Sequence, residues 1–144
     1  MALSKISELG SGVCVDSGAE LTITALADGT AKAGWYVGLT AAGVVAGADS
    51  DSPDAGFGLL LKRYDTDLDT SPTATRQVRV VIPRAGRRYR VFCADMNASL
   101  VGLPMNVAAD AGKFAVVATV ESYHLCRCSR YTDGDTVAEV IWGV

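Results

Sequence analysis

The chain has 144 residues, of which 49% are hydrophobic and 20% are charged, and its formal net charge is −3. A chain of this length forms one domain or two tightly coupled lobes, and it buries enough surface to fold without a metal or disulfide. The negative charge argues against a general nucleic-acid binder, which should be basic. No run approaches the roughly 18 apolar residues of a membrane span, and the N-terminus lacks a signal-peptide pattern, so we expect no membrane segment.

Short runs rich in Val, Thr, Ala and aromatic residues follow one another along the chain and predict strands. In chain order they are LTITAL (21–26), GWYVGLT (34–40), GVVAGA (43–48), FGLLLKRY (57–64), QVRVVIP (77–83), RRYRVFCA (87–94), KFAVVATV (113–120), YHLCRC (123–128) and TVAEVIW (136–142). Val78 and Val80 fall on one side of their run, as do Tyr89 and Val91 in theirs, which is the period of a half-buried strand.

Glycine-containing turns separate these runs, and no window carries a helical stripe longer than three turns. The sequence therefore predicts an all-β fold, a small β-tulip-like barrel or sandwich of short antiparallel strands. Residues 1–19 are expected to form an N-terminal arm and residues 20–144 the β domain; 97–103 is a weak helix candidate. Two stretches share the same order of features: Val-Gly-Leu, then a glycine turn, then Val-rich strands. The β domain could therefore consist of two similar lobes, 20–95 and 96–144, instead of one undivided unit.

His124, Cys126 and Cys128 recur at every second residue, so on a strand their side chains would face one side. Structural zinc sites use four ligands, often as two close pairs, whereas this chain has a single histidine and Cys14 and Cys93 are isolated. Buried cysteine commonly acts as a small hydrophobic residue. We expect this run to pack in the core, and we predict no metal ligand, cofactor or catalytic residue. A metal- or redox-dependent enzyme using the three side chains is the alternative.

The acidic spacing of Asp65, Asp67 and Asp69 begins like a calcium-binding loop. Such a loop needs glycine at its sixth position and glutamate at its twelfth, where this chain has Thr70 and Arg76. We therefore interpret these carboxylates as solvated side chains of an exposed loop.

An arginine cluster occupies residues 76–90, where no acidic residue occurs, whereas residues 49–69 are rich in aspartate. One interpretation is that opposite charges are solvated or pair within the molecule, where surface pairs contribute little stability. The other is that a basic hairpin meets an acidic surface of a neighbouring subunit, which would set the register of the contact.

The phrases YVGLTAAGVVAGADSD, FGLLLKRYDTD, LVGLPMNVAADAGKFAVVAT and TDGDTVAEVIWG follow a short arm and alternate strands with glycine turns. In this order of strands and turns, the chain resembles the small decoration, or cement, proteins of tailed bacteriophages. The resemblance covers most of residues 20–144 and rests on turn placement, without a specific catalytic motif.

The resemblance implies a structural virion protein, made in the host cytoplasm, that binds the outer surface of an icosahedral capsid. Such a protein bridges neighbouring subunits of the major capsid protein, has no active site, and is commonly a homo-oligomer, with a trimer favoured. We expect no direct nucleic-acid binding. The predicted contact residues lie in the arm and the arginine hairpin: Leu3, Ile6, Leu9, Arg84, Arg87, Arg88 and Arg90.

A third function class is a glycan- or receptor-binding β-barrel. Trp35, Tyr36 and Trp142 could form its aromatic surface, although aromatic residues in strands more often pack in a core.

Overall fold

The computed structural model describes residues 13–27, 31, 33–40, 43–45, 56–61, 77–93, 96–107, 112–117, 124–134 and 136–144. Over these ranges the fold is all-β, as predicted, and the only helical element is a three-residue 3-10 turn, Ala98–Leu100. The strands are β1 (Thr22–Leu26), β2 (Tyr36–Thr40), β3 (Gly43–Val45), β4 (Gly56–Leu60), β5 (Gln77–Val81), β6 (Arg88–Phe92), β7 (Pro104–Val107), β8 (Phe114–Val116), β9 (Cys126–Arg130) and β10 (Val137–Trp142).

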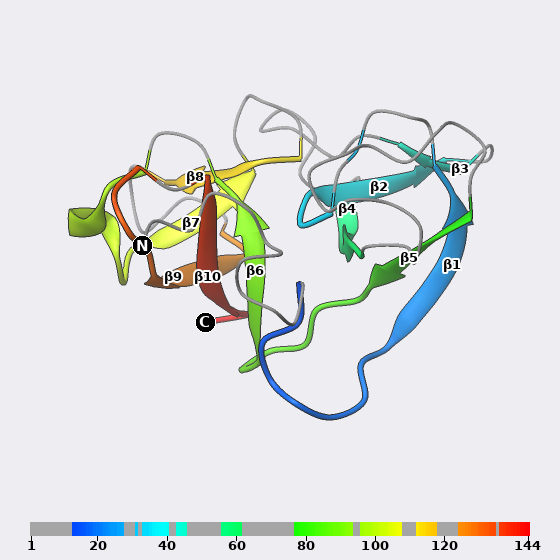
Figure 1. Cartoon of the computed structure of the whole chain (residues 1–144), viewed down its shortest axis with the longest axis horizontal. Coiled ribbons are helices and arrows are strands. Elements are labelled where there is room, and N and C mark those ends of the chain that lie inside the picture. The colour runs from blue at the N-terminus through cyan, green and yellow to red at the C-terminus, as the bar shows by residue number, and fades with distance from the viewer. Residues whose placement is uncertain are drawn as a thin grey trace.

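The strands form two antiparallel sheets, which lie side by side in Figure 1. The first sheet has the order β1-β5-β4-β2-β3 and the second the order β6-β10-β9-β7-β8. If β6 is matched to β1, β7 to β2 and so on, the two orders are identical. We call the two sheets, with their connecting segments, the first and second lobes. The second sheet curls into a half-barrel, because Cys93 after β6 forms a bridge to Phe114 of β8 at the opposite edge.

The boundary between the sheets lies earlier in the chain than the lobe boundary at 95/96 considered from the sequence. β6 pairs with β10 through its whole length, so it belongs to the second sheet. The chain therefore passes from one sheet to the other between Val81 and Arg88.

Nine strands coincide with or overlap the predicted runs, and β7 is the strand that the sequence did not predict. β7 begins with Pro104, which has no backbone N–H to donate and is tolerated in a sheet at the first residue of a strand. The weak helix candidate at 97–103 corresponds to the short 3-10 turn just before it.

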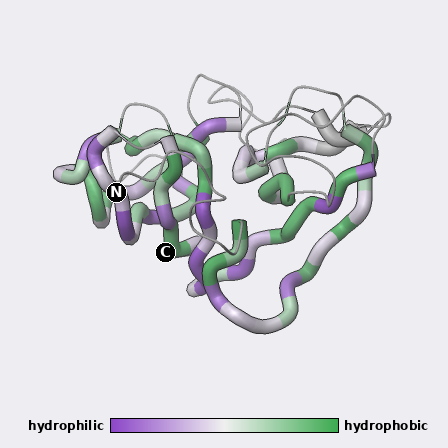
Figure 2. The backbone as a smooth tube through the Cα atoms, viewed as in Figure 1, coloured by the Kyte–Doolittle hydropathy of each residue, from purple (hydrophilic) through white to green (hydrophobic). Residues whose placement is uncertain are grey.

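A small core fills the first lobe. Its buried members come from β2, β4, β5 and the segment after β1: Ala27, Ala31, Val37, Leu60, Val78 and Val80. Along β5, Val78 and Val80 are buried, whereas Gln77 and Arg79 are exposed, which confirms the predicted alternation. Figure 2 shows this alternation as hydrophobic and hydrophilic bands along β5.

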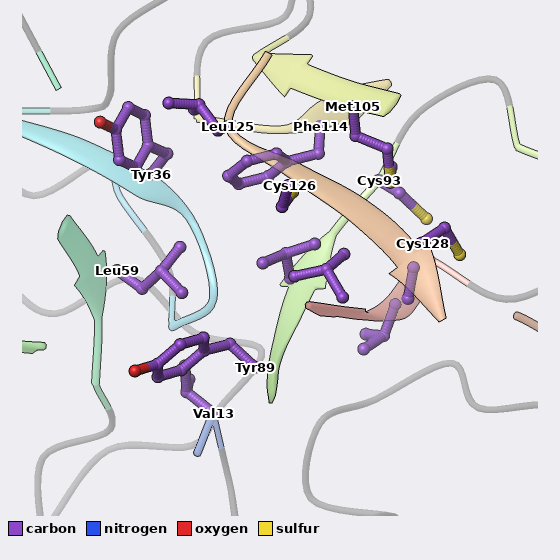
Figure 3. Packing of buried hydrophobic residues seen from close by; sticks show 14 of the residues in the cluster. Val13, Tyr36, Leu59, Tyr89, Cys93, Met105, Phe114, Leu125, Cys126 and Cys128 are labelled. Carbon is purple, nitrogen blue, oxygen red and sulfur yellow. The ribbon is translucent and has the colours of Figure 1, made fainter. Parts of the chain in front are cut away.

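A larger core fills the second lobe and extends into the first. Leu59 and Val81 of the first lobe belong to the same buried cluster as Tyr89 and Phe114 of the second. Figure 3 shows Leu59 among the second-lobe side chains. Because Val81 points away from the first lobe's own core, the first sheet contributes its other face to the contact between the lobes.

Aromatic rings and backbone hydrogen bonds also join the lobes. The ring of Tyr36 in β2 lies 5.8 Å from that of Phe114 and 5.7 Å from that of Trp142, between centroids. The Tyr36 N–H donates to the Gly112 carbonyl over 2.9 Å. The Tyr36–Phe114 contact is edge-on, and contacts of this kind add stability beyond the area that they bury.

Candidate functional site

Residues 13–20, which we call the N-terminal strap, lie along the edge of β6 that faces away from β10 (Figure 1). The Arg90 N–H donates to the Val13 carbonyl over 2.8 Å, and the Val15 N–H donates to the Arg88 carbonyl over 3.2 Å. The Val13 side chain is 2% exposed and belongs to the large core. The last part of the predicted arm is thus an extra strand-like segment of the second sheet.

The first charged contact of the strap joins Asp16 to Arg88. The Asp16 carboxylate accepts from the Arg88 backbone N–H at 2.8 Å, from its Nε at 3.0 Å and from its Nη2 at 2.7 Å. On the other side, Arg88 Nη1 lies 3.6 Å from a carboxylate oxygen of Glu139 in β10. Hydrogen bonds from Arg88 lower the pKa of the Asp16 carboxyl, because they favour its ionised form.

The second charged contact joins Glu20 to Arg87 and Tyr89. Arg87 donates its Nε to Glu20 over 2.5 Å and its Nη2 to the Ser17 carbonyl over 2.9 Å. The hydroxyl of the buried Tyr89 donates to Glu20 over 2.9 Å and accepts from the Arg84 N–H over 3.0 Å. Burial raises the pKa of Tyr89, so the hydroxyl remains a donor. The strap is therefore held by ordinary edge pairing and by two acid–arginine contacts.

These contacts show where the predicted hairpin residues lie. Arg87 and Arg88 pair with acids of their own chain, so the intramolecular interpretation describes them, with partners in the strap. Arg90 is 6% exposed, and Arg84 lies exposed in the turn before β6. That any of them touches a neighbouring subunit stays a prediction.

The other predicted contact residues and acidic segments are not described. Leu3, Ile6 and Leu9 lie outside the described residues, as do all the aspartates of 49–69. The calcium-like spacing at 65–69 therefore also stays a sequence interpretation.

The cysteine run of β9 lies in the core, as predicted. Cys126 is 0% exposed and Cys128 2% exposed, and both belong to the large core seen in Figure 3. Burial raises the pKa of the Cys126 thiol well above its ordinary value. His124 precedes the strand, is partly exposed, and places Nε2 3.1 Å from the Val144 carbonyl oxygen. Within the described ranges no group of three or more His, Cys, Asp or Glu side chains is placed to hold a metal ion.

The aromatic residues considered for a binding surface do not lie together on one. Tyr36 is 5% exposed and packs against Trp142. Trp35 lies beside Gly112 at the contact between the lobes, with the Lys113 ammonium 5.6 Å from its ring centroid.

A loop that the sequence analysis missed presents apolar side chains at one end of the second lobe. In this loop, residues 98–103, Val101 is 40% and Leu103 42% exposed. We call it the apolar loop; it leads from the 3-10 turn at the left of Figure 1 to β7. It carries no charged residue. The sequence feature that could have revealed this loop is the run LVGL (100–103), whose apolar residues were interpreted as part of a weak helix candidate.

Hydrogen bonds hold the apolar loop in place at several points. The Gly102 N–H donates to the Cys128 carbonyl over 2.8 Å, and Arg127 Nη1 donates to the Gly102 carbonyl over 3.2 Å. The Ala98 N–H donates to the Asp133 carboxylate over 2.6 Å. Gly102 has φ +92°, a conformation that favours glycine. Val101 and Leu103 are therefore exposed because these hydrogen bonds fix the backbone conformation of the loop.

Comparison with known proteins does not assign the chain to a family: no protein-family model and no curated protein matches its sequence. No described helix is long and apolar enough to cross a lipid bilayer.

Proposed function

We propose that the protein is a structural virion protein that binds the outer surface of an icosahedral phage capsid and bridges neighbouring major capsid protein subunits. The observation that carries the proposal is the apolar loop, in which Val101 and Leu103 are about two-fifths exposed on a backbone held by hydrogen bonds. Two exposed apolar side chains close together on one uncharged loop offer a small surface that a protein contact would cover.

The energetics suit a protein that acts in many symmetric copies. Fully burying a leucine or valine contributes about 1.5–3 kcal/mol, so covering the exposed parts of these two side chains contributes on the order of 1 kcal/mol each. A contact of this strength is weak for one copy. In a lattice it is multiplied by the number of sites and by tethering within an oligomer, which we propose is a trimer. Binding only to the assembled shell then stabilises that state by mass action.

The resemblance of the sequence to decoration proteins supports the same proposal. It rests on the order of strands and turns in residues 20–144. The predicted arm and hairpin contacts remain part of it. The intramolecular pairing of Arg87 and Arg88 changes how their role in binding is tested, because replacing either arginine also removes one of the contacts that hold the strap. Arg84, which is exposed in the turn, is the better probe of the hairpin.

The test is co-sedimentation with expanded capsids assembled from the major capsid protein encoded in the same genome. We expect saturable binding at a fixed number of copies per capsid and a higher temperature of capsid disruption. Absence of binding to expanded capsids would overturn the proposal.

Matched variants separate the two surfaces. The double variant Val101→Asp with Leu103→Asp should weaken binding at least tenfold, and Arg84→Glu should weaken it if the hairpin contributes. Val144→Asp is the control, because Val144 is an exposed apolar residue of the same lobe outside the loop. Equal binding by the loop variant and the control would remove the apolar loop from the contact.

A further inference from the structure

The two lobes can be aligned residue by residue from their hydrogen bonds. At the start of β1, the Ile82 N–H donates to the Leu21 carbonyl over 2.8 Å. At the start of β6, the Trp142 N–H donates to the Arg87 carbonyl over 3.0 Å. Each bond joins the residue before the first strand of a lobe to a residue at the end of the fifth. Leu21 therefore corresponds to Arg87.

Counting on from this match, Thr22 and Thr24 of β1 correspond to Arg88 and Arg90 of β6. Backbone groups alternate between the two sides of an antiparallel strand. On β6 the N–H of Arg90 and the carbonyl of Arg88 point away from β10 and pair with the strap. On β1 the equivalent groups of Thr22 and Thr24 point away from β5. Among the residues that the structure describes, β5 is the strand that pairs with β1.

The burial of the two strands differs as this comparison predicts. Beneath the strap, Tyr89 and Val91 of β6 are 0% exposed. The corresponding residues of β1, Ile23 and Ala25, face the core of the first lobe but are only partly buried. Leu21, which begins this edge, is 60% exposed. Among the described residues, no segment covers the edge of β1 in the way that the strap covers β6.

We infer that the edge of β1 at Thr22 and Thr24 is an acceptor site for an extended segment of a partner protein, added antiparallel as the strap is added to β6. Backbone hydrogen bonds would give the affinity, and natural proteins seldom leave such an edge uncovered. The strap indicates the chemistry of the segment: apolar residues at alternate positions followed by an acid. Arg79 Nη2 donates to Thr22 Oγ1 over 2.9 Å, which places a guanidinium beside Thr22, the residue that corresponds to Arg88.

The probe is a synthetic peptide that copies strap residues 13–20 with serine in place of the cysteine, titrated into the full-length ¹⁵N-labelled protein. We expect saturable shifts of the Thr22 and Thr24 amide signals and at least tenfold slower hydrogen exchange of the Thr24 amide. A peptide with asparagine in place of its aspartate should bind several-fold more weakly, because it loses the charge that meets Arg79.

Two controls address the edge directly. Thr24→Pro removes the outward N–H without removing a bond to β5 and should abolish binding, whereas Thr24→Ser should retain it. A peptide N-methylated at its second valine cannot donate to the Thr22 carbonyl and should bind at least tenfold more weakly to the unaltered protein. Equal binding of the methylated peptide, no shift at all, or shifts confined to Arg90 and Val15 would overturn the inference. The last result would mean that the peptide only replaces the strap on β6.

Discussion

Phe114→Ala should destabilise both lobes, because this side chain lies where they meet. Phe114 is 0% exposed, and its ring centroid lies 5.8 Å from that of Tyr36 and 6.0 Å from that of Trp142. Truncating a buried phenylalanine to alanine typically lowers the free energy of unfolding by about 3–5 kcal/mol. With an unfolding entropy of about 2.1 cal/mol/K per residue, a chain of 144 residues loses roughly 10–17 °C in Tm.

Circular dichroism should give this Tm loss, and tryptophan fluorescence should show that the lobes respond together. Trp35 reports on the first lobe and Trp142 on the second, so variants with one tryptophan each allow the two transitions to be compared. The Phe114→Leu variant should have a Tm about 3–5 °C below that of the parent protein. Leu26 of β1 is 44% exposed, so the Leu26→Ala variant should lower Tm by less than about 2 °C. A Phe114→Ala variant that resembles Leu26→Ala, or that destabilises only the second lobe, would refute the coupling inferred from the packing.

Three further changes test other parts of the structure. Cys126→Ser should lower the free energy of unfolding by about 1–3 kcal/mol more than Cys126→Ala in chemical denaturation, because it buries a hydroxyl in an apolar core; equal values would argue against a core role. Gly58→Ala should cost about 1–3 kcal/mol, since its Cβ would lie 2.5 Å from the backbone carbonyl oxygen of Val81, and an unchanged denaturation midpoint would contradict this packing. Because Arg88 lowers the pKa of Asp16 from its ordinary value of 3.8, the stabilisation by Asp16 is present above that pH and is lost as pH falls through the folded pKa. Asp16→Asn should therefore lower Tm at pH 7 and match the parent protein near pH 2, and a difference that persists at low pH would contradict the charged contact.

Local pattern sufficed to predict the strands whose two faces differ in environment. Val78 and Val80 alternate with polar residues along β5, and burial follows that alternation. The cysteines of β9 follow the same rule, since Cys126 and Cys128 share the buried side while Arg127 and Ser129 are partly exposed. In these strands the side-chain period carries the structural information.

The sequence did not predict β7 because neither face of this strand is exposed. All of its residues, Pro104–Val107, are buried, so no polar and apolar alternation marks the strand. The shared Val-Gly-Leu phrase was also misleading as a guide to register. In the first lobe it lies within β2, whereas in the second it precedes β7.

Contacts between distant residues account for the rest of what the sequence did not predict. Arg88 and Asp16 are 72 positions apart, and no local pattern relates them. The same holds for the pairing of β6 with β10, which assigns β6 to the second sheet and moves the division between the lobes. Charge segregation along the chain pointed to the aspartate-rich segment as the partner of the arginines. The described acidic partners of Arg87 and Arg88 lie instead in the strap and, for Arg88, also in β10.

The connection between the lobes holds the two proposed contact regions, the apolar loop and the edge of β1, relative to each other. A protein that bridges two neighbours needs two contact surfaces held at a fixed separation, because a loose connection would lose binding free energy to conformational freedom. The apolar loop and β1 lie at opposite ends of the long axis of the molecule in Figure 1. Between them, the rings of Tyr36 and Phe114 pack together, and the strap runs from β6 of one lobe to β1 of the other. If both surfaces bind, Phe114→Ala should weaken the bridging of two partners more than the binding of either one, since it loosens the connection and leaves both surfaces unchanged.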